Sequence, residues 1–397
     1  MDFREAEDHL LGLELFGMRF GLERMHKLMT ALGLPQRRFA SIHVVGSNGK
    51  SSTVRFIAAI LQRQGLRTGS YTSPHLASFR ERIEVTEEPV SEVRFAAAVE
   101  RTIGPVEEIT QFEAIIAAAY HELAASKVDV AVIEAGLGGR YDATNVIPSK
   151  VAVLTGVGLE HTRWLGPTIA DIAAEKLAVV RDHSILVVPP DLHPDALEVA
   201  RAVVSERHAR MVTAPSPGGP FQRRNFTLAY VAAAEFLGEA PEPEAVESAA
   251  RETRIPGRLD VVAQEPLVVH DGAHNPAGAA ALAEALPEVL GGRRPAVVVA
   301  SVLDDKDAAG MLAALLPLFD HAVFTRCANP RALSPATLES LAAKLGGPPS
   351  ETVAEPRAAM GRAREIAGRG GAVVATGSIY LIADLVRAEG TARPSSL

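Results

Sequence analysis

The chain has 397 residues, 47% hydrophobic and 22% charged, which is the composition of a globular protein with room for two or three domains. Its net charge of -8 argues against binding to duplex nucleic acid, which needs a basic face, although a local basic pocket remains compatible with it. The single cysteine, Cys327, cannot form an internal disulfide, and the N-terminal sequence lacks a signal-peptide pattern, so we expect a cytoplasmic protein. The longest apolar stretch, AVVVASVL at 296–303, is too short to span a membrane.

Short β-branched runs alternate with longer amphipathic segments, which predicts a parallel α/β fold. In the first half the predicted strands are 41–45, 128–134, 151–155 and 184–188, and the predicted helices are about 50–64, 112–126, 169–181, 193–207 and 224–238. The segment TAPSPGGP at 213–220 has the composition of a loop.

The same rhythm restarts in the second half of the chain. Its predicted strands are 267–271, 295–301, 321–325 and 372–376, and its predicted helices are about 277–290, 307–318, 335–345, 356–368 and 379–388. The segment RIPGRLD at 254–260 carries a Pro-Gly turn where the pattern restarts, which predicts two domains, 1–254 and 255–397. The tail 389–397 is expected to be frayed.

Residues 42–53, IHVVGSNGKSST, have the pattern of a strand, a glycine turn and a helix start, which directs backbone N–H groups at an anion. Lys50 would add a charge between the β- and γ-phosphates, and Ser51 or Ser52 would reach a magnesium ion. The loop is shorter than the common phosphate loop, because only two residues separate Gly46 from Gly49. The alternative is a tight turn in which the serines cap a helix.

The segment YTSPHLASFRERIEV at 71–85 predicts a turn at Ser73-Pro74 that suits a loop over a site. By residue type alone Ser73 is more typical of a turn than of a ligand. Arg80 and Arg82 either clamp a carboxylate in the bidentate geometry that arginine favours or are solvated surface charges.

Glu134 ends a predicted strand, at the edge where ligand sites of open parallel sheets gather, and a glycine-rich segment follows it. Its carboxylate either holds a hard cation or is a satisfied loop acid. His161 follows the next strand and is interpreted, by itself, as a structural histidine. Lys176 lies on an Ala-, Ile- and Leu-rich helix and is either a surface lysine or a residue that points into a site.

In the second half, VVHDGAHNPAG at 268–278 is again a strand, a polar turn and a helix start. Asp271 at the strand end would hold ribose hydroxyls. His274 and Asn275 precede a proline at a helix entrance, where their side chains would merely cap the helix. Arg258 lies at the inferred hinge, where it either reaches a nucleotide across a cleft or forms an interdomain salt bridge.

Together these motifs resemble a known family. GSNGK, SPHL, EAGLGGRYDATN, the EH and EK pattern of 160–176, PGRL, HDGAHNP, DKD (305–307), NPRAL (329–333) and TGSIYL (376–381) occur in the order found in folylpolyglutamate synthase/dihydrofolate synthase, of the Mur-ligase superfamily. The superfamily's own phosphate loop is of the short type. The resemblance implies an N-terminal P-loop ATPase-type domain with a mostly parallel sheet, which binds ATP and the pterin, and a smaller C-terminal Rossmann-like glutamate-ligase domain.

The resemblance also implies roles for single residues. ATP would be bound by Gly46, Asn48, Gly49, Lys50, Ser51, Ser52, Asn225, Arg258, Asp271 and His274. Mg²⁺ would be bound by Ser73, Glu134 and His161. The pterin-bearing substrate would be bordered by Arg82, Phe112, Glu113 and Asp142. Catalytic roles would fall to Lys50, His161 and Lys176, the last matching a carbamylated lysine that supports a second magnesium ion.

The implied reaction is the ATP-dependent addition of L-glutamate to dihydropteroate, to reduced folates or to both, through an acyl phosphate, by a monomer. Two residues depart from the family pattern: Ser51 stands where glycine is usual, and Leu177 replaces the smaller alanine after the lysine. The alternatives are a Mur-type ligase acting on a cell-wall UDP-substrate and a non-catalytic ATP-binding protein.

Overall fold

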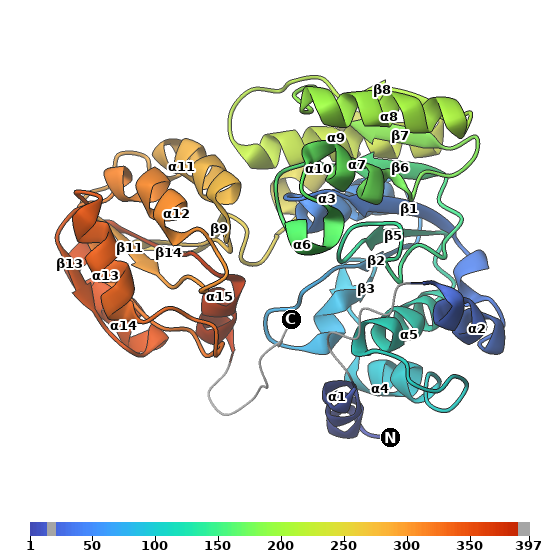
Figure 1. The fold of residues 1–397 in the computed structure, drawn as a ribbon, viewed down its shortest axis with the longest axis horizontal. Helices are drawn as coiled ribbons and strands as arrows, with labels where there is room; N and C mark the ends of the chain where they lie inside the picture. Colours follow the sequence, from blue (N-terminus) through green and yellow to red (C-terminus); the bar gives the residue numbers. More distant parts are fainter. Residues whose placement is uncertain (14–20, 388–397) are drawn as a thin grey trace.

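The protein is described by a computed structural model of residues 1–13 and 21–387. The chain forms two lobes, each built on its own sheet (Figure 1). The first sheet has the strand order β4-β3-β2-β5-β1-β6-β7-β8, and the second has the order β13-β12-β11-β14-β10-β9. The predicted α/β fold with two largely parallel sheets is therefore confirmed. The last residue of the helix predicted at 379–388 and the tail 389–397 lie outside the described residues.

The first sheet is parallel from β2 to β8, and only the short β3 and β4 run antiparallel at its edge. Its strands are β1 (Ala40–Val45), β2 (Thr68–Tyr71), β3 (Ile83–Val85), β4 (Glu88–Pro89), β5 (Val130–Glu134), β6 (Val151–Leu154), β7 (Ile185–Val188) and β8 (Arg210–Thr213). Ile42 on β1 pairs in register with Val132 on β5 and Val151 on β6, so the central strands bury an apolar surface on both faces.

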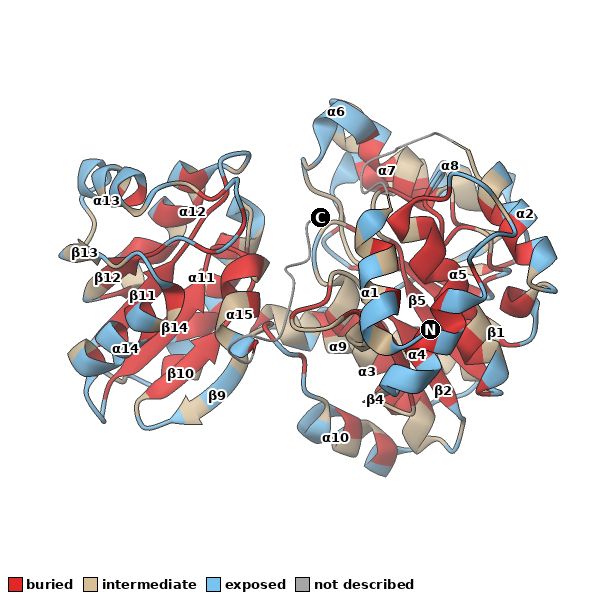
Figure 2. Cartoon of the chain, turned by 90° about the horizontal axis from the view of Figure 1, so that it is seen from below, coloured by how far each residue is buried: buried red, intermediate tan, exposed pale blue. Residues whose placement is uncertain are grey.

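Helices cover both faces of this sheet, as the alternation of side chains along each strand requires. One face packs against α3 (Lys50–Arg63), α9 (Phe221–Leu237) and α10 (Pro243–Glu252). The other face packs against α1 (Phe3–Gly12), α2 (Glu23–Ala31), α4 (Glu92–Glu100), α5 (Gln111–Ala125), α7 (Ile169–Leu177) and α8 (Pro194–Glu206). The single-turn α6 (Thr162–Leu165) precedes α7. Figure 2 shows the resulting contrast between the buried strands and the exposed outer helix faces.

The second sheet is also parallel except for its edge strand β9. Its strands are β9 (Asp260–Gln264), β10 (Leu267–His270), β11 (Ala296–Ala300), β12 (His321–Phe324), β13 (Ser350–Thr352) and β14 (Ala372–Thr376). One face is covered by α11 (Pro276–Leu290), α12 (Ala308–Leu315) and α13 (Pro335–Lys344), and the other by α14 (Pro356–Ala367) and α15 (Ile379–Val386). The chain crosses from one sheet to the other through residues 253–259.

A loop of the first lobe contributes to the core of the second. Leu76, which follows β2, is 7% exposed and packs in the cluster that contains Val268 and Leu381. Arg387 donates from Nε to the Leu76 carbonyl oxygen at 3.0 Å. The two lobes are thus joined by packing as well as by the connecting chain. Among the described residues, no helix combines the length and the apolar character needed to cross a bilayer.

Candidate active site

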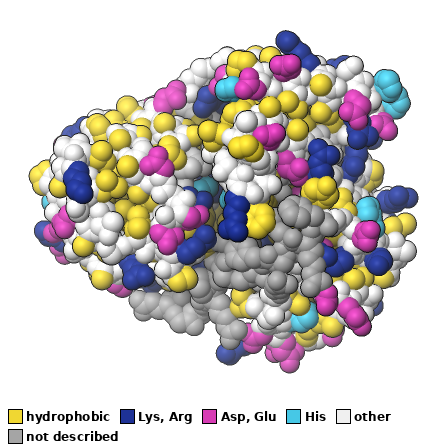
Figure 3. Space-filling view, in the orientation of Figure 1, with side chains coloured by type: hydrophobic (Ala, Val, Ile, Leu, Met, Phe, Trp, Pro, Cys, Tyr) yellow, Lys and Arg dark blue, Asp and Glu magenta, His cyan; other side chains and the backbone are white. Residues whose placement is uncertain are grey.

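A cleft of about 970 Å³ lies where the two lobes meet. Both lobes line it, through the carboxyl ends of β1, β5 and β6 on one side and the segment after β10 on the other. On the face drawn in Figure 3, acidic, basic and apolar side chains are interspersed. Of the predicted site residues, the cleft is lined by Asn48, Gly49, Lys50, Ser51, Ser52, Ser73, Phe112, Glu113, Glu134, Asp142, His161, Asn225, Arg258, Asp271 and His274.

The phosphate loop joins β1 to α3 through two glycines with positive φ. Gly46 has φ +148°, and a Cβ there would clash with the Thr155 hydroxyl oxygen. Gly49 has φ +84°, and a Cβ there would meet Asn225 Oδ1 at 2.5 Å. Because α3 begins at Lys50, its first N–H groups face the loop. The predicted strand, glycine turn and helix are therefore confirmed, and the alternative of a turn capped by serines is not supported, because no side chain caps α3.

Lys50 folds back over this loop. Its Nζ donates to the carbonyl oxygens of Gly46 at 3.0 Å and Ser47 at 3.3 Å. The ammonium therefore lies at the mouth of the loop, where its charge adds to the field of the helix N-terminus and favours an anion.

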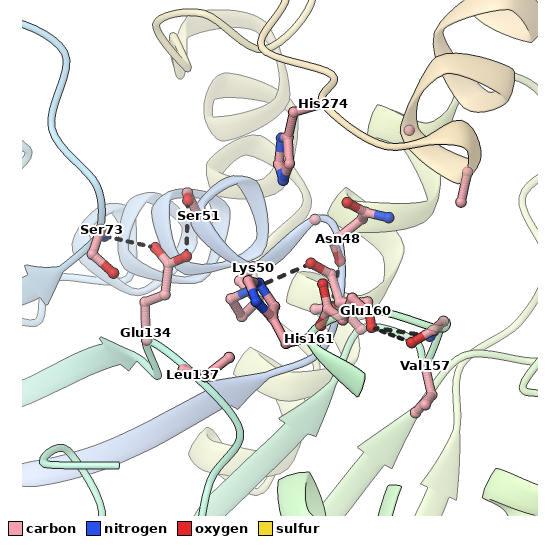
Figure 4. A pocket seen from close by; sticks show the side chains of 18 of the residues that line it. Asn48, Lys50, Ser51, Ser73, Glu134, Leu137, Val157, Glu160, His161 and His274 are labelled. Carbon is pink, nitrogen blue, oxygen red and sulfur yellow. Dashed lines mark hydrogen bonds between the residues drawn. The ribbon is translucent and has the colours of Figure 1, made fainter. Parts of the chain in front are cut away.

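Glu134 ends β5 inside the cleft and is held from two sides. Ser51 donates from Oγ to Glu134 Oε1 at 3.0 Å, and the Ser73 N–H donates to Oε2 at 3.1 Å (Figure 4). The side chain is only 2% exposed. This burial raises the pKa of Glu134, while Lys50 and the two hydrogen bonds act in the opposite direction.

The oxygen donors around Glu134 suit a hard cation such as Mg²⁺, which takes one or two carboxylates together with substrate phosphates. Ser73, whose N–H holds this carboxylate, also carries a hydroxyl, and both residues line the cleft together with the phosphate loop. Within residues 1–13 and 21–387, no group of three His, Cys, Asp or Glu side chains converges on one point. Besides protein ligands, a bound Mg²⁺ usually takes substrate phosphates and water.

His161 lies at the cleft wall just before α6, with a left-handed backbone at φ 46°. Burial lowers the pKa of its imidazole, and Lys306 and Lys50 lower it further against the pull of Glu160. A neutral imidazole is the form that binds a metal ion.

Lys176 lies behind the phosphate loop and does not line the cleft. Its Nζ donates to the Gly46 carbonyl oxygen at 2.9 Å and to Glu160 Oε1 at 2.8 Å, and the residue is 2% exposed. Burial lowers the pKa of Lys176 despite the attraction of Glu160. Burial alone would raise the pKa of Glu160, but Lys176 and Lys50 outweigh it and lower that pKa to about 2. Leu177 packs away from this pair, in the core cluster.

The second lobe closes the cleft with Arg258, Asp271 and His274, and Figure 4 shows His274 across the space from Lys50. Asp271 is 3% exposed, and its carboxylate accepts from the N–H groups of Leu259 and Ala273, each at 2.8 Å. It thereby fixes the hinge next to Arg258. Burial and then Arg258 lower the pKa of His274 to about 4, so this imidazole is neutral at pH 7.

Two residues predicted to border the substrate, Glu113 and Asp142, interact with other residues of the first lobe. Glu113 forms a 3.0 Å ion pair with Arg24 and caps the start of α5. Asp142 accepts from the N–H groups of Gly136 and Leu137, each at 2.9 Å. Both carboxylates border the cleft while they shape its wall.

The structure does not bring Arg82 to the cleft, against the expectation that it borders the pterin pocket. Arg82 is 1% exposed, its Nε donates to His75 Nδ1 at 3.0 Å, and its guanidinium lies over the Phe79 ring. Arg82 is therefore neither a clamp for a substrate carboxylate nor a solvated surface charge. It is a buried arginine that packs within its own loop.

Three cleft residues receive no role from the sequence. Glu160 stands beside His161 in the same motif, and its position after a strand is an available signal. Lys306 and Arg331 lie in the DKD and NPRAL segments, and both line the cleft. Asn275 caps α11, as its position before a proline predicts.

Known families match most of the chain. Residues 44–215 match the Mur ligase middle domain, and residues 257–379 match the Mur ligase glutamate ligase domain. The chain is 34% identical over 390 residues to the dihydrofolate synthase/folylpolyglutamate synthase of Mycobacterium tuberculosis, covering 84% of this chain and 80% of that protein. The protein of the same name from Bacillus subtilis is also 34% identical, with 83% and 86% covered. The chain belongs to the dihydrofolate synthase/folylpolyglutamate synthase family.

Solved structures of this family share the whole fold. Folylpolyglutamate synthase of M. tuberculosis, complexed with ADP and AMPPCP, superimposes with a TM-score of 0.88 at 32% identity and covers 96% of this chain and 97% of that chain. FolC of Escherichia coli, in complex with DHPP and ADP, gives 0.86 at 27% identity, with 97% of each chain covered. As a member of the dihydrofolate synthase/folylpolyglutamate synthase family, the protein is an acid–amino-acid ligase that forms carbon–nitrogen bonds.

Proposed function

We propose that the protein uses ATP to add L-glutamate to dihydropteroate, to reduced folates or to both. The observation that carries this proposal is the arrangement of Lys50 and Glu134 beside a glycine phosphate loop, in a cleft that the second lobe closes with Asp271 and His274. The relatives that carry the same two family domains are named dihydrofolate synthase/folylpolyglutamate synthase, which supports the choice of substrates.

In the proposed reaction a carboxylate oxygen of the folate substrate attacks the γ-phosphorus of ATP and displaces ADP. The glutamate amine then attacks the acyl carbon, the C–N bond forms, and inorganic phosphate leaves. The domain predicted over residues 1–254 would bind ATP and the pterin, and the domain predicted over residues 255–397 would bind glutamate. The phosphate loop and Lys50 stabilise the charge that develops on the transferred phosphoryl group, while closure keeps water from the acyl phosphate.

A divalent cation belongs to this proposal because Glu134 and Ser73 offer oxygen donors beside the phosphate loop. Glu134 and Ser73 would hold Mg²⁺, which would neutralise negative charge on the phosphates of ATP. The manganese found with AMPPNP in the Yersinia pestis relative supports the use of a divalent ion. His161 would complete this ligand set as a neutral imidazole.

The glutamate would enter beside the cationic side chains of the second lobe. Lys306 and Arg331 both line the cleft and share Asp305, at 3.2 Å and 3.5 Å. Positive charge at this wall favours a dicarboxylate over a neutral amino acid.

Carbamylation of Lys176 is proposed as a further property. A lowered pKa leaves more of the amine in the neutral form that reacts with CO₂, which supports the modification. The product would be an anion beside Glu160, so a second cation would have to bind with it. The test is NMR in ¹³C-bicarbonate with and without Mg²⁺: we expect a carbamate signal that is absent in Lys176→Ala, and its absence from the wild type would contradict carbamylation.

The test of the main function is product analysis with ATP, glutamate and either dihydropteroate or tetrahydrofolate, supplied separately. We expect glutamate-dependent release of ADP with at least one folate substrate. Turnover only with a UDP-muramoyl substrate would favour the Mur-type alternative, and ATP binding without glutamate-dependent hydrolysis would favour the non-catalytic one. The monomeric state and the cytoplasmic location stay predictions, of which the first is checked by analytical ultracentrifugation.

A further inference from the structure

Ser51, the hydroxyl residue that directly follows the phosphate-loop lysine, directs its Oγ at Glu134. Figure 4 shows Ser51 and Ser73 on the same carboxylate. The carboxylate comes from β5, the hydroxyl from α3, and the Ser73 N–H from the segment after β2. Glu134 is therefore fixed between two other elements of the first lobe.

The Ser51 hydroxyl does not cap α3. A capping serine occupies the position before the first helical residue, where its oxygen accepts from an N–H of the first turn. That position is Gly49, and Ser51 is the second residue inside the helix. Its hydroxyl is instead the donor to Glu134 Oε1 at 3.0 Å.

The two hydrogen bonds on Glu134 orient the carboxylate without saturating it. A carboxylate offers about four lone-pair sites, two on each oxygen. In the described part of the chain, Ser51 is the hydrogen-bond partner of Oε1 and the Ser73 N–H that of Oε2. Each oxygen thus keeps a lone pair that can bind a cation. The two hydrogen bonds also offset part of the free-energy cost of burying the carboxylate.

We propose that Ser51 is a positioning residue, which holds Glu134 in the orientation that binds the divalent cation and does not itself bind phosphate. The inference rests on the proposed function, because that function assigns the cation to Glu134. It also gives a role to the serine that stands where the family resemblance leads us to expect glycine.

The test compares Ser51→Ala, which removes the hydroxyl, with Ser51→Thr, which retains it. Mn²⁺ binding to the enzyme–ADP complex is measured by electron paramagnetic resonance, and ADP binding by calorimetry in EDTA. Because groups that orient a metal ligand typically contribute about 10- to 100-fold to metal affinity, we expect Ser51→Ala to raise the Kd of Mn²⁺ about 10-fold or more. We expect metal-free ADP binding to stay unchanged, and Ser51→Thr to bind Mn²⁺ like the wild type.

A loss of metal-free ADP affinity in Ser51→Ala would make Ser51 a phosphate ligand and overturn the inference, as would an unchanged Kd for Mn²⁺. In a Glu134→Gln background, Ser51→Ala should cause no further loss of Mn²⁺ affinity, because the two groups act as one unit. If Glu134→Gln itself leaves Mn²⁺ binding intact, the cation site of the proposed function fails. If Glu134→Gln weakens binding and Ser51→Ala does not, only the role of Ser51 fails.

Discussion

Asn48 in the phosphate loop and Asn275 at the start of α11 form a reciprocal amide pair across the cleft. Asn275 Nδ2 donates to Asn48 Oδ1 at 3.2 Å, and Asn48 Nδ2 donates to Asn275 Oδ1 at 3.5 Å. Asn275 also caps α11, because its Oδ1 accepts from the Gly278 N–H at 2.7 Å. The loop proposed to bind ATP phosphates is thereby linked directly to the position of the second lobe.

Replacing both asparagines by aspartate should open the cleft. Asn275→Asp alone keeps the helix cap, since a carboxylate caps as well as an amide, but Asn48→Asp in the same chain sets two negative charges against each other. We expect a larger radius of gyration for the double variant by small-angle X-ray scattering at low salt, and a value close to the wild type for Asn275→Asp. Identical scattering from the double variant and the wild type would show that the pair does not hold the lobes together.

Shortening Leu76 should uncouple the two lobes. Because this side chain of the first lobe is buried in the core of the second, Leu76→Ala should cost about 2–5 kcal/mol of unfolding free energy. We expect the calorimetric transition to broaden or split, as the lobes lose a shared contact. The control is Leu338→Ala, a fully buried leucine within the second lobe, which should lower the stability of that lobe without removing an interlobe contact. Equal behaviour of the two variants would contradict the coupling.

The sequence predicts those parts of the site whose requirements are local. Positive φ at Gly46 and Gly49 is a property of a short turn between a strand and a helix, so the phosphate loop can be recognised from its own residues. The meeting of Ser51 with Glu134 joins residues 83 positions apart and depends on how β5 lies beside β1. The family resemblance does not predict this contact either, because the family usually has glycine at the position of Ser51.

The errors have physical causes as well. An arginine among polar neighbours looks solvated, and the pattern cannot show that His75 and Phe79 bury Arg82. The sequence does not predict strands β2 and β8, because TGSY and RMVT contain only one and two β-branched residues. Pairing with β5 and β7 forms these strands instead. The sequence patterns also do not predict several elements that depend on packing against the rest of their lobe: the exposed edge strand β9 and the outer helices α1, α2, α4 and α10.

The buried His43 should make stability fall in mild acid. Thr144 donates its hydroxyl to Asp142, so His43 Nε2 is the donor in its 2.8 Å contact with Thr144 Oγ1, while Nδ1 has no partner among the described residues. Burial, with a contribution from Arg181, lowers the pKa of His43 from 6.5 to about 3. The unfolded chain therefore binds more protons between these values, and each pH unit below 6.5 should cost about 1.4 kcal/mol until the pH reaches the folded-state pKa.

The variant His43→Gln isolates this contribution. The variant should be less stable than the wild type at pH 7, because removal of the ring leaves a gap beside β1. Between pH 6 and 4, however, its unfolding free energy should fall less steeply with pH than that of the wild type, by the equivalent of about one bound proton. The measurement is urea unfolding of the wild type and of His43→Gln at several pH values between 4 and 7. If the unfolding free energies of His43→Gln and the wild type fell equally steeply with pH, His43 would not be the source of the acid sensitivity.

Removing the carboxylate of Glu160 should destabilise the protein, because the buried ammonium of Lys176 then has no counter-ion. In the protein without bound CO₂, the Lys176 ammonium donates to Glu160 and to the Gly46 carbonyl oxygen, and the lysine side chain is only 3% exposed. Glu160→Gln leaves that charge without a counter-ion, so we expect a loss of about 3–5 kcal/mol in unfolding free energy at pH 7, measured in urea. Adding Lys176→Met should restore part of it, because the unpaired charge is gone and Lys50 still donates to Gly46. If the double variant were no more stable than Glu160→Gln alone, the unpaired charge of Lys176 would not be the cause of the lost stability.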